Sequence, residues 1–158
     1  MTVRLRDAAE ADLPVLLRLV RALAAYEKLE HRVRATEEDF RRALFGTPAR
    51  AEALLAEVDG TPVGFALWFH NFSTFEGRPG LYLEDVFVEP GHRGRGIGRR
   101  IFRELARRAV EAGCARMEWS VLDWNAPAIG FYRAVGARGM DEWTVQRLDG
   151  DALRALAA

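Results

Sequence analysis

The stretch LYLEDVFVEPGHRGRGIGRRIFREL, residues 81–105, predicts a strand, a glycine-rich turn and a helix in direct succession. Apolar residues dominate its first part, and a proline–glycine pair ends the run, as expected where a strand passes into a loop. After the turn, Ile97, Ile101 and Leu105 recur at helical spacing. Glycines between a strand and a helix start let backbone N–H groups approach an anion closely. Because four arginines surround the turn, its simplest ligand is a pyrophosphate.

Two common phosphate-binding motifs do not fit this turn. The pattern G-x-x-x-x-G-K-[ST] does not occur, and the only lysine in the chain is Lys28. The dinucleotide pattern G-x-G-x-x-G fails from Gly94, because Arg99 occupies the position of the last glycine. A nicotinamide dinucleotide binder is therefore disfavoured. The pattern that fits is Arg93-x-x-Gly96-x-Gly98, placed directly after a strand.

Hydrophobic periodicity and turn residues predict an alternation of strands and helices along the whole chain. The expected elements are a strand at 3–6, a helix opening at 7–12 and running to about 27, a helix from 36 to 46, strands at 51–58 and 62–69, a loop at 71–80, strands at 81–88 and 114–121, a helix from 125 to 136, a strand at 143–148 and a short helix at 151–156. The helix after the glycine-rich turn makes the strands on either side of it parallel neighbours. The fold class is α/β, with one domain spanning 1–158.

Composition narrows the function classes. The 158 residues suffice for one domain with a sizeable core, and 23 basic residues balance 23 acidic ones, which argues against a general nucleic-acid binder. The single cysteine, Cys114, has no partner for an internal disulfide, and its apolar surroundings predict a buried, inert thiol. We expect a cytoplasmic protein without a membrane partner, because the chain has no signal peptide and no long apolar run. Three scattered histidines predict no metal site.

The motif from Arg93 to Gly98 resembles the acetyl-CoA-binding motif of the GNAT superfamily of N-acetyltransferases, and the expected order of elements is also the GNAT order. Within that superfamily the chain resembles the diamine (spermidine/spermine) N-acetyltransferase group over nearly its whole length. The resemblance is carried by Arg6 with Asp12, Leu23-Ala24-x-Tyr26-Glu27, Tyr82-Leu83-Glu84-Asp85-x-Phe87-Val88, the glycine-rich motif, and Trp124-Asn125-x-Pro127-x-Ile129-x-Phe131-Tyr132. It departs at 73–77, where that group tends to carry an acid and a tryptophan. Here Phe75 and Glu76 stand in that region.

The resemblance implies a GNAT-like, centrally splayed mixed sheet flanked by helices, acetyl-CoA as co-substrate, and a homodimer. It implies that Tyr132 protonates the coenzyme A thiolate. Unpaired backbone groups at Phe87 and Val88 are expected to bond the pantetheine amides. The residues expected to bind the co-substrate are Phe87, Val88, Arg93, Gly94, Arg95, Gly96, Ile97, Gly98, Asn125 and Tyr132.

Glu84 and Asp85 are adjacent acids in an otherwise apolar strand, where unpartnered carboxylates are costly. In a regular strand their side chains point to opposite faces. We expect Glu84 to act as the catalytic base, directly or through a water, or to anchor the amine. The alternative is a pair of salt-bridged acids at a sheet bulge. The residues expected to bind the amine are Tyr26, Glu27, Glu84, Asp85 and Trp143, because acids and aromatic rings suit a cation.

The predicted function is transfer of an acetyl group from acetyl-CoA to a primary amine of a small molecule, such as a diamine, a polyamine or a thialysine-like amino acid. Two alternatives stay open. One is an enzyme that acetylates a protein or peptide amine, and the other is a non-catalytic regulator that binds acyl-CoA.

Overall fold

A five-stranded mixed sheet organises the computed structural model, which describes residues 1–158. The strands lie in sequence order, and the first four pair with one another in antiparallel orientation. Their bounds are β1 (Val3–Asp7), β2 (Glu52–Val58), β3 (Thr61–Ser73), β4 (Arg78–Val88) and β5 (Met117–Glu118). β5 pairs in parallel with β4, which confirms the expected crossover. The chain divides into two compact units, Met1–Ser120 and Val121–Ala158, and the sheet belongs to the first.

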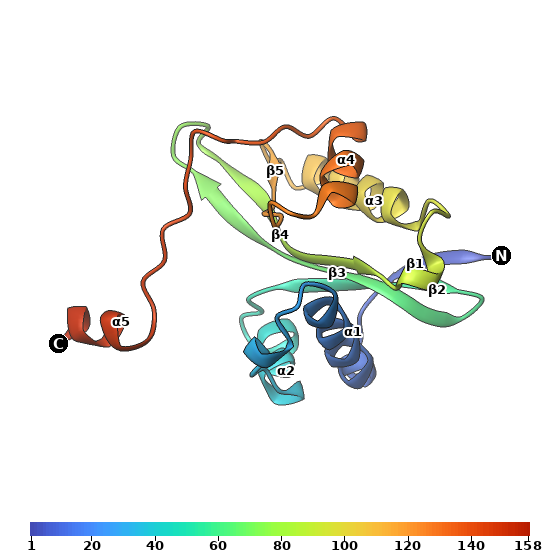
Figure 1. Ribbon diagram of the computed structural model, residues 1–158, viewed down its shortest axis with the longest axis horizontal. Coiled ribbons are helices and arrows are strands. Elements are labelled where there is room, and N and C mark those ends of the chain that lie inside the picture. Colours follow the sequence, from blue (N-terminus) through green and yellow to red (C-terminus); the bar gives the residue numbers. More distant parts are fainter. The chain divides into compact units, whose positions relative to one another are not determined.

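Helices cover both faces of this sheet: α1 (Leu13–Tyr26) and α2 (Glu37–Phe45) lie on one face and α3 (Ile97–Glu111) on the other (Figure 1). Three short 3-10 turns, η1 (Glu10–Asp12), η2 (Glu30–Arg32) and η3 (Pro90–His92), connect the elements. On the α1 side, buried Leu16 and Leu19 pack with Leu55, Phe65 and Phe87 of the sheet. No helix is long and apolar enough to cross a membrane.

A partly buried ionic network joins β1, β2 and the start of α1. The Nε of Arg6 donates to Glu57 at 2.7 Å, while its two terminal nitrogens donate to Asp12 at 2.7 and 3.0 Å. The hydrogen bonds from Arg6 hold the pKa of the Asp12 carboxyl below its usual range. The pairing of Arg6 with Asp12, noted above as part of the sequence resemblance, is therefore a structural clamp between strand and helix.

Helix boundaries follow the local signals in the sequence. At the start of α2, the Thr36 hydroxyl accepts from the Asp39 N–H at 3.3 Å, and the Asp39 carboxylate accepts from the Thr36 N–H at 2.8 Å. This reciprocal capping satisfies two N–H groups that would otherwise lack partners. Gly46 follows α2 as its C-cap. The prediction of a helix from Thr36 to Gly46 is confirmed.

The prediction of a loop at 71–80 is wrong. β3 continues to Ser73 and β4 begins at Arg78, so only a short turn separates the two strands. The pairs Asn71–Gly80, Phe72–Pro79 and Ser73–Arg78 extend the ladder between them. Small and polar residues suggest a loop locally, but here the register set further along the hairpin carries the pairing through them. In the turn, the Phe75 side chain is fully exposed, and the Glu76 N–H donates to the Ser73 hydroxyl at 3.2 Å.

The predicted strand at 114–121 is much shorter than expected, because β5 holds only two residues. Its register partners on β4 are Leu81 and Tyr82. From Leu83 onward, β4 has left β5, although it continues beside β3 as far as Val88. The mixed sheet flanked by helices is confirmed, and it opens between β4 and the edge strand β5.

The second unit contains α4 (Ala126–Ala134) and α5 (Gly150–Ala157). The Asn125 side-chain oxygen accepts from the Ala128 N–H at 3.3 Å, so Asn125 is the N-cap of α4. The predicted strand at 143–148 is wrong, since this stretch has no strand structure. Trp143 and Val145 alternate as in a strand, but their side chains are 77% and 78% exposed. Alternation alone does not make a strand, because a strand also needs a paired neighbour.

Candidate active site

The glycine-rich loop has the geometry that an anion site needs. Gly94 and Gly96 have φ of 75° and 78°, a region that glycine adopts without strain. Gly96 is the N-cap of α3, and no other atom lies within 4 Å of the point where its Cβ would stand. Ile97 is buried and anchors the first turn of the helix, whereas Arg95 is exposed. The helix start with its free N–H groups therefore faces open space, which fits a pyrophosphate.

Arg93 lies differently from the other arginines of the loop. Its Nε donates to the Val88 carbonyl at 2.8 Å. Its guanidinium carbon lies 4.3 Å from the centre of the Tyr26 ring and 5.4 Å from that of Phe87. The side chain thus turns toward the end of α1 and the end of β4. It also engages one of the Val88 backbone groups that we expected to be unpaired.

A β-bulge interrupts β4 at the two adjacent acids. Leu83 pairs with Trp68, and Asp85 pairs with Leu67, so Glu84 is an extra residue between two consecutive pairs. The regular alternation expected for Glu84 and Asp85 does not hold here, because a bulge re-aims the side chains around it. Asp85 thereby shares the register of Leu67, which packs against the core below α1 and α2.

Three carboxylates gather at this bulge: Glu27, Glu84 and Asp85. Burial raises the pKa of Asp85 to about 6, and repulsion from Glu84 and Glu27 adds to the increase. Burial also raises the pKa of Glu27. No basic side chain offsets the rise at Asp85, so the salt-bridged pair considered above is not formed. We call Glu27, Glu84 and Asp85 the acid cluster.

Glu27 stands where helix electrostatics disfavour an acid. α1 ends at Tyr26, and Glu27 is its C-cap. A carboxylate there faces the negative end of the helix dipole. The next residue, Lys28, has φ of 61°, so the chain turns away immediately. An acid that is locally unfavourable in two respects, its place at the helix end and its partial burial, is typical of a functional site.

The remaining residues predicted for the site, Asn125, Tyr132 and Trp143, belong to the second unit. Asn125 is buried and caps α4, and Tyr132 is half-buried on that helix. The Tyr132 ring centre lies 5.8 Å from that of Phe131 in an edge-on arrangement. Trp143 lies in the exposed stretch described above. The roles of these three residues stay predictions.

Replacing Asp85 by asparagine is expected to stabilise the fold at pH 7 by about 1–3 kcal/mol, because an ionised Asp85 is disfavoured by burial and by its two acidic neighbours. Since its pKa is higher in the folded state, the wild type gains stability as the pH falls from about 6 toward the unfolded value of about 3.9. The difference in free energy of unfolding between Asp85→Asn and wild type should therefore shrink over that range. Urea unfolding at several pH values measures this difference, and Asp123→Asn, a change at an exposed acid, is the control. An Asp85→Asn protein less stable than wild type at pH 7 would contradict the raised pKa.

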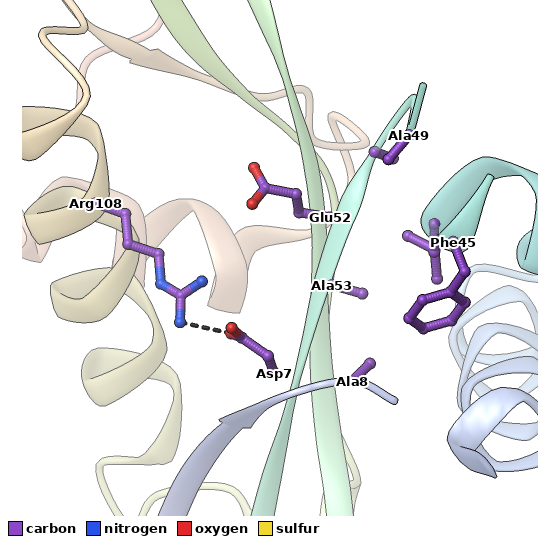
Figure 2. A pocket seen from close by; sticks show the side chains of 9 residues that line it. Asp7, Ala8, Phe45, Ala49, Glu52, Ala53 and Arg108 are labelled. Carbon is purple, nitrogen blue, oxygen red and sulfur yellow. Dashed lines mark hydrogen bonds and ion pairs between the residues drawn. The ribbon is translucent and has the colours of Figure 1, made fainter. Parts of the chain in front are cut away.

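A separate cavity of about 260 Å³ lies at one end of the sheet. Figure 2 shows Ala8, Phe45 and Ala53 on its α2 side. On the other side, Arg108 reaches from α3 to the Asp7 carboxylate at 2.6 Å (Figure 2). No residue predicted for the active site lines this cavity.

Comparison with known proteins gives one family for most of the chain. The model of the acetyltransferase (GNAT) family matches residues 16–137. That range includes the glycine-rich loop and the acid cluster, and it also includes Tyr132.

Similar proteins extend the match to nearly the full length. A thialysine N-epsilon-acetyltransferase of Bos taurus is 40% identical, over 98% of this chain and 97% of its own. A human spermidine/spermine N(1)-acetyltransferase-like protein is 30% identical over 98% of this chain and 24% of its own. Among solved structures, an integron cassette protein of V. cholerae superposes with a TM-score of 0.82 at 26% identity, covering 99% of this chain and 98% of that one.

Proposed function

The chain belongs to the acetyltransferase (GNAT) family and is an N-acetyltransferase, and from this premise we propose that it acetylates the primary amine of a small molecule that carries a further charged group. Diamines, polyamines and thialysine-like amino acids are substrates of this kind. The relatives named for thialysine and for spermidine or spermine support the proposal, since both names describe small amines.

The acid cluster is the observation that carries this proposal. Burial, with added repulsion from Glu84 and Glu27, makes ionisation of the half-buried Asp85 costly, and no basic side chain offsets that cost. A cationic substrate supplies the missing positive charge and relieves the repulsion. Tyr26 directly precedes Glu27; the guanidinium of Arg93 covers one face of its ring, and we propose that the rest of the ring lies along the aliphatic stem of the amine.

We place acetyl-CoA at the glycine-rich loop, where it would supply the acetyl group as a thioester. The N–H groups at the start of α3 and the exposed side chain of Arg95 would hold the pyrophosphate. The edge of β4 at Phe87 and Val88 lies where β5 has departed, and its backbone groups would hold the pantetheine arm. We also propose that Asn125 and Tyr132 of the second unit contribute to co-substrate binding.

Acetyl transfer first requires a neutral amine. A primary amine has a pKa of about 10, so only about one molecule in a thousand is neutral near pH 7, at a cost of roughly 4 kcal/mol. We assign the proton acceptor to the bulge, with Glu84 taking the proton directly or through a water. The Asp85 carboxylate attracts the ammonium group of the substrate and holds it at the bulge. Tyr132 then donates its hydroxyl proton to the departing sulfur.

We further propose that residues 1–158 act as one domain, in the cytoplasm and as a homodimer. Neither a nucleic acid nor a membrane is part of the proposed reaction.

A panel of amines tests the function, with free thiol release as the measured signal. The panel pairs a diamine, a triamine, a basic amino acid and a peptide with a lysine against a primary amine with a neutral tail. We expect turnover to be highest for amines with a second charged group. Preference for the peptide would favour a protein acetyltransferase, and no release with any amine would favour a non-catalytic role.

Charge reversal at Glu27 tests the acid cluster directly. Glu27→Arg is expected to raise the KM for a diamine at least tenfold, while the KM for the neutral-tailed amine changes by less than about threefold. Charges a few ångströms apart near a surface interact by a few kcal/mol, and 1.4 kcal/mol is already a tenfold change in binding. Low salt preserves the effect. Glu30→Arg, an exposed acid in η2, is the matched control and should leave both KM values within twofold. Equal losses for both amines would mean that Glu27 only supports the helix end.

A further inference from the structure

The Arg93 side chain makes contacts that a phosphate-binding role does not require. It donates to the Val88 carbonyl at 2.8 Å and lies over the Tyr26 ring at 4.3 Å, with Phe87 at 5.4 Å. These groups come from three elements: the loop after η3, the end of β4 and the last turn of α1. One planar guanidinium therefore connects the predicted acetyl-CoA loop to the residue that precedes Glu27.

The neighbouring arginines show that this placement is particular to Arg93. Arg95 contacts only the sulfur of Met1, at 3.8 Å, and Arg100 reaches back to the Val3 carbonyl at 3.3 Å. Neither of them lies on an aromatic ring of the site. A guanidinium can donate along its edge while its face covers a ring, whereas an ammonium is a point charge that cannot do both in one plane.

The two ring contacts of Arg93 differ in how firmly they are held. Phe87 is 4% exposed and belongs to the core cluster with Leu16 and Leu19 of α1. Tyr26 packs at the margin of that cluster, in the last residue of α1, and Lys28 turns the chain away two positions later. Arg93 thus covers the point where α1 ends and where Glu27 must be held.

We propose that Arg93 is a positioning residue that fixes the end of α1 against the acetyl-CoA loop, and thereby sets the place of Glu27 for the second charge of the amine. The inference rests on the proposed function and deepens it. Loss of Arg93 frees the last turn of α1, so binding of a doubly charged amine weakens more than binding of a singly charged one. The backbone N–H groups of the loop stay in place for the acetyl donor.

Steady-state kinetics with a diamine and a neutral-tailed monoamine test this proposal. Arg93→Ala is expected to raise the diamine KM at least fivefold, with the monoamine and acetyl-CoA KM values within about threefold. Arg93→Met keeps an aliphatic side chain and removes the guanidinium group. It should give the same pattern, and it replaces the alanine variant if that variant folds poorly. Arg95→Ala is the matched control, because it should raise the KM for acetyl-CoA and leave the diamine-to-monoamine ratio unchanged.

A double-variant cycle tests whether Tyr26 is the partner of Arg93. Tyr26→Leu should reproduce the pattern of Arg93→Ala. The combined variant should be no worse than either alone, since each single change already removes the contact between Arg93 and the Tyr26 ring. Additive losses, or a rise confined to the acetyl-CoA KM, would overturn the proposal. Equal rises for diamine and monoamine would also overturn it, because they indicate a general loss of structure. A wild-type protein without amine-dependent thiol release would refute the proposed function itself, which is a different result.

Discussion

Gly96→Glu should abolish measurable binding of acetyl-CoA and leave the fold in place. Gly96 has φ of 78° and caps α3, and its missing Cβ leaves open space at the helix start. A glutamate there fills that space and brings a carboxylate toward the proposed pyrophosphate. Like charges about 4 Å apart near a surface repel by about 4 kcal/mol, so together with the lost backbone approach the expected weakening is about 100-fold or more. Titration calorimetry with acetyl-CoA measures it.

Gly113→Glu is a closely matched control for backbone strain. Gly113 has φ of 75°, also has open space at its Cβ position, and lies beyond the other end of α3. Both variants carry the same new side chain at the same strained angle, which costs about 1–2 kcal/mol of stability. Only Gly96→Glu should lose binding, although both should lose a similar amount of thermal stability. Unchanged affinity in Gly96→Glu would remove the loop from the acetyl-CoA site.

Features encoded within one turn of chain were predictable from sequence. The Thr36 cap, the Asn125 cap and the glycine-rich loop each depend on residues within a few positions of one another. Such caps can be predicted from sequence because the capping side chain and the backbone N–H that it satisfies lie only a few residues apart in the chain. Periodicity and turn residues predicted most of the order of the elements, and the family resemblance then implied the mixed, splayed sheet that this order forms.

Features that depend on pairing between distant segments were not predictable. The hairpin of β3 and β4 continues through Asn71 and Gly80 because an established register carries it there. The stretch 143–148 has the alternation of a strand but no paired neighbour. The bulge at Glu84 is also a property of two strands, since it is defined by the shift between Leu67 and Trp68 on β3. The sequence named the two acids as candidates, but it could not reveal this register shift.

For the acid cluster too, the residues could be named from the sequence, but their arrangement in space could not. Glu27 and Asp85 were predicted separately as substrate-binding residues, one at a helix end and the other in a strand. The repulsion that Glu27 exerts on Asp85 appears only when the helix end and the bulge are placed together. Burial at the bulge, with this repulsion added, raises the pKa of Asp85, an effect that adjacency in the sequence alone could not give. The perturbation in turn supports a cationic substrate, because such a substrate relieves it.

Tyr132→Phe is expected to lower kcat by about 100-fold or more, the typical contribution of a general acid or base, with little change in the affinity for acetyl-CoA. The substitution removes one hydroxyl and keeps the ring, so the edge-on contact with Phe131 at 5.8 Å and the helix around it are preserved. The hydroxyl is needed chiefly as the sulfur departs, and an interaction made mainly in the transition state appears in kcat rather than in binding.

Tyr82→Phe is the matched control for this change, because it removes a tyrosine hydroxyl that lies 3.3 Å from the Ser120 hydroxyl, outside the predicted catalytic set. Its kcat should stay within about threefold of wild type. Pre-steady-state release of free thiol, followed at saturating amine and acetyl-CoA, separates the chemical step from product release. A slower first turnover in Tyr132→Phe, with an unchanged dissociation constant for acetyl-CoA, assigns the proton donor to Tyr132. A kcat within twofold of wild type would mean that the departing sulfur takes its proton from a group other than Tyr132.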